Sequence, residues 1–407
     1  MNRHALITLC LVVAVDAACF GLLLPVLPFF VGDLTGNFNA VAITQVTAVY
    51  AGCQLVGAPL IGRLSDHLGR KPLMAVSVGV GSLALLGSAL APNLLTLMVF
   101  QGIKGFSASV FALAQAVVAD SVKEGNKRTV SFGALGASLG LGFVTGPAVG
   151  GLLGSINPRA PFFAATALTL VNLVQILLVL QESRSAHDTH ALQSDPLRFW
   201  SGESKDLRRL LTVYFLFYLG FSAFTSIFVV DARDRFGWGP QAAGLVLCYV
   251  GVVAAAVQGG LLPKLLKRFV AGRLAGTGLI MVAVAIFGVA AIRHGGELYL
   301  TQLVFATGVG LSTPGLRSLL SLTVNDNQQG ILGGLTQSCI SLTELLGPLM
   351  AGRLYTYGGY ATTYQVQAAL VLLAAGLLIS EGRRLLDRNT TSGAVIEHPS
   401  AEPAPTR

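Results

Sequence analysis

Charged side chains are scarce in this chain of 407 residues, of which Asp, Glu, Lys and Arg together make up 11%. Soluble domains contain about 25% charged residues, so the scarcity excludes a soluble globular protein. Apolar residues instead make up 53% of the sequence, and the mean hydropathy is +0.69. These values indicate an integral membrane protein that has the lipid bilayer as its first partner.

Other absences exclude further classes. No segment of about ten residues alternates polar and apolar side chains, as the strands of a transmembrane β-barrel would. The five cysteines lie inside apolar runs, which excludes a secreted-type disulfide framework. The six histidines lie outside those runs, and neither a metal site nor another cofactor is predicted. No pair of catalytic acids, zinc-binding helix or phosphate-cradling loop indicates an enzyme, and no appended soluble domain indicates a sensor.

The apolar residues form runs of about 20 residues, the length that crosses a bilayer as an α-helix. The first run is too long for a signal peptide and carries Asp16 at its centre, so it counts as a span. The chain is therefore predicted to be an all-α membrane protein. The twelve predicted transmembrane helices are 5–30, 41–61, 72–91, 94–118, 130–154, 161–180, 209–230, 241–263, 272–292, 298–320, 331–354 and 361–381.

Lysine and arginine gather in the loops on one side of the predicted bundle, which sets its orientation by the positive-inside rule. The opposite loops hold only Arg159, Arg233, Arg235 and Arg293, with Arg353 near an outer helix end. Both termini are therefore predicted to be cytoplasmic, in a plasma membrane or in the inner membrane of a Gram-negative cell. The net charge of +8 is a signal of topology and does not indicate nucleic-acid binding.

The spans divide into two groups of six. Residues 1–180 are the predicted N-terminal bundle and 209–381 the C-terminal bundle, joined by a polar cytoplasmic linker at 181–208. Residues 382–407 end in a stretch rich in Pro, Ser, Thr and Glu, and this cytoplasmic tail is predicted to be disordered. One copy of such a chain contains a complete pathway, so we expect it to function as a monomer.

A glycine series fills the fifth span and also supports the division into halves. Glycine permits close backbone approach between helices in a bilayer, and a Gly-Pro pair permits a kink. Gly146-Pro147 recurs as Gly347-Pro348, and Gly151 recurs as Gly352, so we expect two pseudo-symmetric six-helix bundles. The packing and kink residues are Gly133, Gly142, Gly146, Pro147, Gly150 and Gly151.

Three charged residues lie deep inside predicted spans: Asp16 in the first, Lys104 in the fourth and Glu344 in the eleventh. A charge at the bilayer centre costs about 2.5–3.5 kcal/mol on insertion scales, so each should face a partner or a cavity. Asp16 is either a buried packing residue or a substrate-facing, protonatable carboxylate. Lys104 is either part of a structural ion pair or a cation that lines the cavity. The polar residues expected along the same pathway are Gln54, Gln101 and Gln115.

A charged loop is predicted at 62–72, between the second and third spans. Its cations Arg63, Arg70 and Lys71 would serve as a plain topology anchor. Asp66 adds nothing to such an anchor, so a working latch is the alternative. Gly62 and Gly69 allow sharp backbone turns in this stretch.

With twelve spans in two halves and this loop, the chain resembles the major facilitator superfamily. The loop is similar to the superfamily's signature between spans 2 and 3, and the glycine series has the spacing of the span 5 signature of its drug/proton antiporters. Asp16 through Pro28, Pro161-Phe162-Phe163 and Arg235-Phe236-Gly237-Trp238 look like the tetracycline/proton antiporters. The resemblance implies a secondary active transporter and not an enzyme. It implies proton-coupled export of a small amphipathic drug such as tetracycline by alternating access.

The resemblance also implies roles for single residues. The 62–72 loop would lock the outward-open state, with Asp66 facing the positive end of span 11 and with Arg70, Asp120 and Arg128 in nearby charge contacts. The deep carboxylates and the deep cation would handle protons and substrate. In this hypothesis the coupling carboxylate is Asp16, its counter-ion is Lys104, and the second acid or ligand for a cationic drug is Glu344.

The chain departs from those antiporters at three polar positions. They carry an acid in span 3 where this chain has Ala84, and an arginine in span 4 where it has Gln101. Their acid in span 9 has no counterpart between Gly272 and Ile292. An alternative function therefore stays open, in which the chain is a proton-coupled or facilitative carrier of a small anionic metabolite with Lys104 as the ligand.

Overall fold

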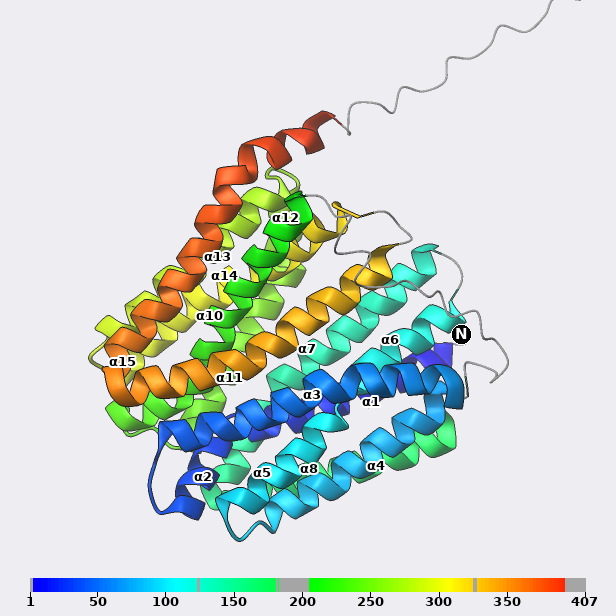
Figure 1. The fold of residues 1–407 in the computed structure, drawn as a ribbon, viewed down its shortest axis with the longest axis vertical. Helices are drawn as coiled ribbons and strands as arrows, with labels where there is room; N and C mark the ends of the chain where they lie inside the picture. The colour runs from blue at the N-terminus through cyan, green and yellow to red at the C-terminus, as the bar shows by residue number, and fades with distance from the viewer. Residues whose placement is uncertain (1–2, 123–124, 181, 183–204, 325–327, 392–407) are drawn as a thin grey trace, which may run out of the picture.

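In the computed structural model the chain is helical, with no strand in the part that is described (Figure 1). Among the described residues, eleven helical stretches are long and apolar enough to cross a membrane. The last of these, α15 (Gln329–Thr391), counts as two spans, because Gly359 interrupts it with φ 76° and ψ 173°. The prediction of an all-α membrane protein with twelve spans is therefore confirmed. The described residues are 3–122, 125–180, 182, 205–324 and 328–391.

The N-terminal half contains the first six spans, of which two are interrupted. The first span changes from α1 to α2 beside Pro25, and the fourth changes from α5 to α6 across Ser107–Ser109. The helices are α1 (Arg3–Leu23), α2 (Leu27–Thr35), α3 (Ala40–Leu68), α4 (Arg70–Ala89), α5 (Leu94–Phe106), α6 (Val110–Ser121), α7 (Gly125–Ile156) and α8 (Ala160–Val179).

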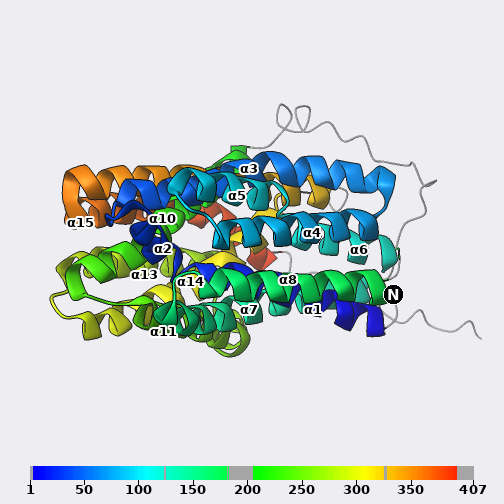
Figure 2. The ribbon, with the colours of Figure 1, turned by 90° about the horizontal axis from the view of Figure 1, so that it is seen from below.

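The C-terminal half contains the other six spans and lies to the left of the N-terminal half in Figure 2. Its second span passes from α11 through the π-helical turn η1 into α12. The elements before α15 are α10 (Lys205–Phe236), α11 (Pro240–Ala256), η1 (Val257–Leu261), α12 (Leu262–Leu266), α13 (Ala271–Ala291), η2 (Gly295–Glu297) and α14 (Leu298–Ser321).

Three predicted boundaries differ from the structure. The predicted loop at 62–72 is helical except at Gly69, whose φ of 96° separates α3 from α4. Residues 205–208 of the predicted linker form the first turn of α10; apart from residue 182, the rest of the linker lies outside the described residues. The helix α15 continues through 382–391, so it ends later than the predicted start of the disordered tail, and 392–407 lie outside the described residues.

Glycine contacts display the internal repeat in three dimensions. A Cβ built at Gly146 would lie 2.6 Å from the backbone oxygen of Ala18 on α1, and one built at Gly347 would lie 2.8 Å from the backbone nitrogen of Ala223 on α10. Each Gly-Pro pair therefore packs against the first helix of its own half. The repeat that the sequence indicated thus has the same packing role in both halves.

The other repeated glycines join the halves to each other. A Cβ at Gly151 would lie 2.6 Å from the oxygen of Pro240 on α11, and one at Gly352 would lie 3.1 Å from the oxygen of Ala40 on α3. Gly142, Gly146 and Gly150 likewise meet α1 backbone, whereas Gly133 has nothing within 4 Å. The close-packing prediction for the fifth span therefore does not extend to Gly133. Figure 1 shows the two resulting seams, α7 beside α11 and α3 beside α15.

The halves meet toward one side and diverge toward the other. We call the side where α1 begins and α3 ends the inner side, and the opposite side the outer side. No side chain of α3 is exposed between Ala40 and Leu55, whereas Val56, Leu60 and Leu64 are 56%, 50% and 46% exposed. At the inner start of α15, Gly333 has nothing within 4 Å of a built Cβ. The two halves therefore lie together toward the outer side and spread apart toward the inner side (Figure 1).

Candidate transport site and latch

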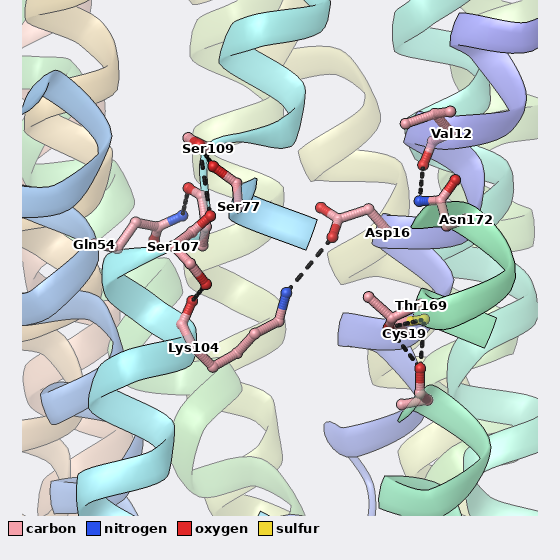
Figure 3. Close-up of polar contacts among 12 residues, drawn as sticks. Val12, Asp16, Cys19, Gln54, Ser77, Lys104, Ser107, Ser109, Thr169 and Asn172 are labelled. Carbon is pink, nitrogen blue, oxygen red and sulfur yellow. Dashed lines mark hydrogen bonds and ion pairs between the residues drawn. The ribbon is translucent and has the colours of Figure 1, made fainter. Parts of the chain in front are cut away.

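An ion pair joins two of the residues that the sequence placed deep in the membrane. The Nζ atom of Lys104 on α5 lies 3.6 Å from Oδ1 of Asp16 on α1 (Figure 3). The Lys104 side chain is 10% exposed and the Asp16 side chain 26% exposed. The pair thus links the first and fourth spans of the N-terminal half in a largely buried position. This geometry gives Lys104 the ion-pair role, one of the two roles that the sequence left open.

Gly81 on α4 makes room for the ammonium group. A Cβ built at Gly81 would lie 3.1 Å from Nζ of Lys104, 3.3 Å from its Cδ and 3.4 Å from Oγ of Ser107. Any larger residue would therefore press on the lysine side chain. The sequence analysis missed Gly81, although a glycine on a span next to a buried charge was the available signal.

The break between α5 and α6 supplies polar groups close to the ion pair. The hydroxyl groups of Ser77 and Ser109 lie 3.1 Å apart, and Nε2 of Gln54 donates to the oxygen of Ala108 at 3.4 Å (Figure 3). Gln54 therefore ties the second span to the interrupted part of the fourth. An interrupted helix exposes backbone oxygens that a continuous helix would use internally, and here a side chain from α3 meets one of them.

The remaining predicted polar residues occupy different depths. Gln101 lies on α5 about one turn before Lys104 and is only 4% exposed. Gln115 lies on α6, nearer the inner side, and is exposed. Among the described residues, no group of three or more His, Cys, Asp or Glu is arranged to hold a metal ion. The structure therefore brings Gln54 and Gln101 near the ion pair and leaves Gln115 apart.

Tyr50 on α3 lies within electrostatic reach of one carboxylate from each half. Its hydroxyl group interacts electrostatically with both Asp16 and Glu344. Glu344 is half-buried on α15, and the side chain of its neighbour Leu345 packs against Gly52 of α3. One carboxylate from each half thus approaches the same tyrosine at the seam between α3 and α15.

Arg70 is the centre of the predicted latch cluster. Its Nη2 lies 2.6 Å from Oδ1 of Asp66 on α3, and its Nε lies 3.0 Å from Oδ2 of Asp120 on α6. A third donor, Nη1, bonds the hydroxyl oxygen of Ser65. Arg70 is only 7% exposed, and buried charge-assisted bonds of this kind are the strong ones. In this inner-open state the cluster ties three helices of one half together.

The start of α4 has an acidic partner that the sequence analysis missed. Oε1 of Glu182, just after α8, accepts from the backbone N–H of Arg70 at 3.0 Å, and Oε2 accepts from that of Lys71 at 3.1 Å. A carboxylate at a helix N-terminus is favoured by the helix dipole. A side chain at Gly69 would be strained, because its φ of 96° lies in the left-handed region and its Cβ would lie 2.7 Å from Oε2 of Glu182. Arg128 belongs to α7, and its side chain lies outside the described part; Gly62 lies in α3 with open space around it.

On the outer side a cation–π contact joins the halves. The guanidinium group of Arg233 on α10 lies 3.9 Å from the ring centroid of Phe38, which precedes α3. Nη1 of Arg233 lies 3.2 Å from Oδ1 of Asp234, and the Tyr355 hydroxyl donates to Oδ2 of Asp234 at 3.3 Å. Arg233, which the sequence analysis placed in an outer loop, thus helps to hold the two halves together on the outer side.

Asp231 is a third buried carboxylate, which the sequence analysis placed beyond the end of the seventh span. It is 1% exposed and pairs with Arg235, one turn later on α10, at 3.2 Å. Arg235 also donates to the oxygen of Val289 at 3.0 Å and to that of Ile292, at the end of α13. An acid and an arginine four residues apart on one helix were the available signal. This pair holds the ends of α10 and α13 together.

The chain is similar in sequence to a known family and to curated proteins. A model of the Major Facilitator Superfamily matches residues 9–348 and 210–403 of the chain. The chain is 31% identical over 386 residues to the tetracycline resistance protein, class C, of Escherichia coli, covering 91% of this chain and 96% of that protein. It is 32% identical over 376 residues to the class G protein of Vibrio anguillarum, covering 88% and 91%.

The fold is also similar to a solved structure. The human organic anion transporter MFSD10 (TETRAN) superposes with a TM-score of 0.71 at 23% sequence identity, covering 92% of this chain and 99% of that chain. At this level of identity the likeness concerns the fold alone.

Proposed function

The chain belongs to the Major Facilitator Superfamily, and from this premise we propose that it exports a tetracycline-like compound in exchange for protons. Members of this class are secondary active transporters and not enzymes. The Asp16–Lys104 ion pair carries the proposal, because it is a titratable carboxylate held beside a cation at a largely buried depth. Relatives about 30% identical over most of the chain are tetracycline resistance proteins, which supports the substrate class.

The proposed coupling uses the sensitivity of a carboxyl group to its surroundings. A nearby cation favours the ionised form, and burial away from water favours the protonated form. Asp16 would be the coupling carboxylate and Lys104 its counter-ion, in a pair that movement of the halves would open and close. Glu344 would act as the second acid or as the ligand for a cationic group of the drug, since it approaches Tyr50 from the other half.

The proposed transport cycle follows from the state seen here. The inner side carries most of the lysines and arginines, so we infer that it is the cytoplasmic side and that both termini are cytoplasmic. Drug would enter from the cytoplasm through the open inner side. Rocking of the halves would then separate Phe38 from Arg233 and bring Asp66 to the start of span 11, where the cluster around Arg70 would lock the outward-open state. One chain contains all these parts, so we propose that the monomer is functional.

An anionic metabolite is the second candidate substrate. A metabolite carrier centred on Lys104 would need that cation to be free, and Lys104 already has Asp16 as its partner. The observation therefore favours the drug/proton exchange over a metabolite carrier that is centred on Lys104.

Uptake of radiolabelled tetracycline into proteoliposomes tests the proposed function. With the interior made more acidic than the outside, uptake against the drug gradient is expected, and a protonophore should abolish it. Uptake that is unchanged by the protonophore would contradict proton coupling. No uptake by monodisperse, correctly inserted protein would contradict the substrate class.

A further inference from the structure

A further cation, Arg317, lies near the inner end of α14, the fourth span of the C-terminal half. In the internal repeat, α14 is the counterpart of the fourth span of the N-terminal half, and that span carries Lys104 on α5. The sequence analysis overlooked Arg317, although a lone arginine three residues before the end of predicted span 298–320 was the available signal. Arg317 is exposed. Charges inside a membrane span mark pathways more often than lipid contacts.

The partners of the two cations differ. Lys104 faces the carboxylate of Asp16 on the first helix of its half. Arg317 instead faces the hydroxyl groups of Tyr214 and Tyr218, on the first helix of its own half, α10. Within the described residues no ion pair joins Arg317 to a carboxylate. The charge of Lys104 in the N-terminal half is therefore neutralised by a carboxylate, whereas Arg317 in the C-terminal half keeps its positive charge.

Contacts of α14 place Arg317 on the face opposite α13. Gly308 and Gly315 pack closely against α13, and Gly310 packs against Val257 of η1, the continuation of α11. Arg317 lies nine residues after Gly308, or about two and a half turns, so it points away from α13. It lies seven residues after Gly310, or about two turns, so it shares the face that meets η1, nearer the inner end of α14.

An aromatic wall adjoins the guanidinium group. The rings of Tyr214 and Tyr218 lie 4.6 Å apart, those of Tyr218 and Phe221 6.1 Å apart, and Phe221 stacks on Phe305 at 5.8 Å. Tyr218 and Phe221 are half-buried. The Tyr214 hydroxyl is buried without a hydrogen bond of normal geometry. An acceptor beside Arg317 would satisfy this orphan donor, whose isolation otherwise costs stability.

We propose that Arg317, with the hydroxyl groups of Tyr214 and Tyr218, binds a negatively charged oxygen group of the transported compound. The compound's flat aromatic body would pack on the adjacent wall of Tyr218 and Phe221. The ligand class is thus an aromatic molecule that carries a carboxylate, enolate or phenolate. This inference rests on the proposed export function, because it assigns the part of the substrate that the C-terminal half holds.

The test compares a planar aromatic acid with its neutral ester. Binding of nalidixic acid and of its methyl ester to the purified full-length chain is measured by isothermal titration calorimetry, in a neutral detergent so that no lipid phosphate competes for the guanidinium group. Wild type should bind the acid more tightly. Arg317→Gln should weaken binding of the acid by about ten- to a hundredfold, the worth of a charge-assisted bond, and leave binding of the ester unchanged. Arg317→Lys should keep part of the preference.

Arg353→Gln is the matched control, since Arg353 is an exposed arginine at the outer end of a span. It should bind both compounds as wild type does. Tyr218→Phe is a second variant for the case in which Arg317→Gln aggregates. It should lower the affinity for the acid by about two- to tenfold, the worth of one neutral hydrogen bond, and leave the affinity for the ester unchanged. An acid preference that survives Arg317→Gln overturns the proposal, and so does a wild type that binds acid and ester alike. With Tyr218→Phe as the only soluble variant, unchanged acid binding overturns it.

Tetracycline uptake by the same proteins separates this inference from the proposed function. An Arg317-dependent preference for the acid, in protein that does not transport tetracycline, would leave the anion site standing and overturn the export proposal. Equal tetracycline uptake by wild type and Arg317→Gln, together with no preference for the acid, would overturn the anion site and leave the export proposal standing.

Discussion

The ammonium group of Lys104 and the carboxylate of Asp16 form an ion pair between the fourth and first spans, which lie far apart in the sequence. The distance of 3.6 Å is that of a pair in direct electrostatic contact, and Asp16 keeps a quarter of its side chain accessible. A pair of this kind is stable while closed, and partial access lets protons and substrate reach it. It is therefore suited to a cycle in which the pair opens and closes.

Removing one partner of the pair should destabilise the protein more than removing both. Asp16→Asn or Lys104→Gln leaves a charge without its partner in a largely buried place, whereas the double variant leaves none. Thermal unfolding in detergent should show a coupling of about 1–3 kcal/mol between the two substitutions. Additive effects would mean that the two side chains do not interact in the protein.

Gly81→Ala should disturb the ion pair without unfolding the chain. The added methyl group would meet the flexible end of Lys104 at 3.1 Å, so the ammonium group must move away from its position beside Asp16. We expect drug transport to fall several-fold. Gly79→Ala on the same helix is the control, because its Cβ would make only an ordinary contact of 3.7 Å with Leu173. Equal transport by the two variants would show that the space at Gly81 does not matter.

Arg70→Lys should slow transport by about tenfold. A lysine ammonium group is a point charge that cannot hold Asp66, Asp120 and Ser65 in the fixed geometry of a guanidinium group, and charge-assisted bonds are worth about 1.5–3 kcal/mol each. Arg63→Lys, which changes an exposed residue of the same stretch, should leave transport within about twofold. Initial rates of tetracycline uptake measure both. A plain topology anchor would tolerate either change.

The contact between Phe38 and Arg233 should be separable during transport. Cysteines at these two positions, in a chain whose five native cysteines are replaced, can be joined by a short thiol cross-linker. The cross-link would hold the outer side closed, so transport should stop and return after reduction. Each single cysteine variant treated in the same way is the control. A cross-linked protein that transports at the rate of the reduced form would contradict the assignment of this contact to outer closure.

The sequence was sufficient for the fold because the bilayer imposes it. A run of about 20 apolar residues has only one way to cross lipid, so the twelve spans follow from hydropathy. Span ends were less predictable. The helix α3 continues to Leu68 with its charged side chains, and Asp66 near its end pairs with Arg70 at the start of α4.

The partners of the site were less predictable from the sequence, for physical reasons. Asp16, Lys104 and Glu344 stood out because isolated charges are rare in spans. Gly81 did not, since its role is the absence of a side chain. Asp231 lay one residue beyond a predicted span end, where hydropathy cannot distinguish a buried carboxylate from a solvated one.

Proton release from everted vesicles on addition of tetracycline tests the central claim most directly. Vesicles that contain the wild-type chain should alkalinise the lumen as tetracycline enters it, because the proposed exchange moves protons out of the lumen. Vesicles that contain Asp16→Asn at equal abundance should show no proton movement, because the coupling carboxylate is gone. Proton movement in Asp16→Asn that matches wild type would contradict the account, and the coupling group would then have to be sought at Glu344.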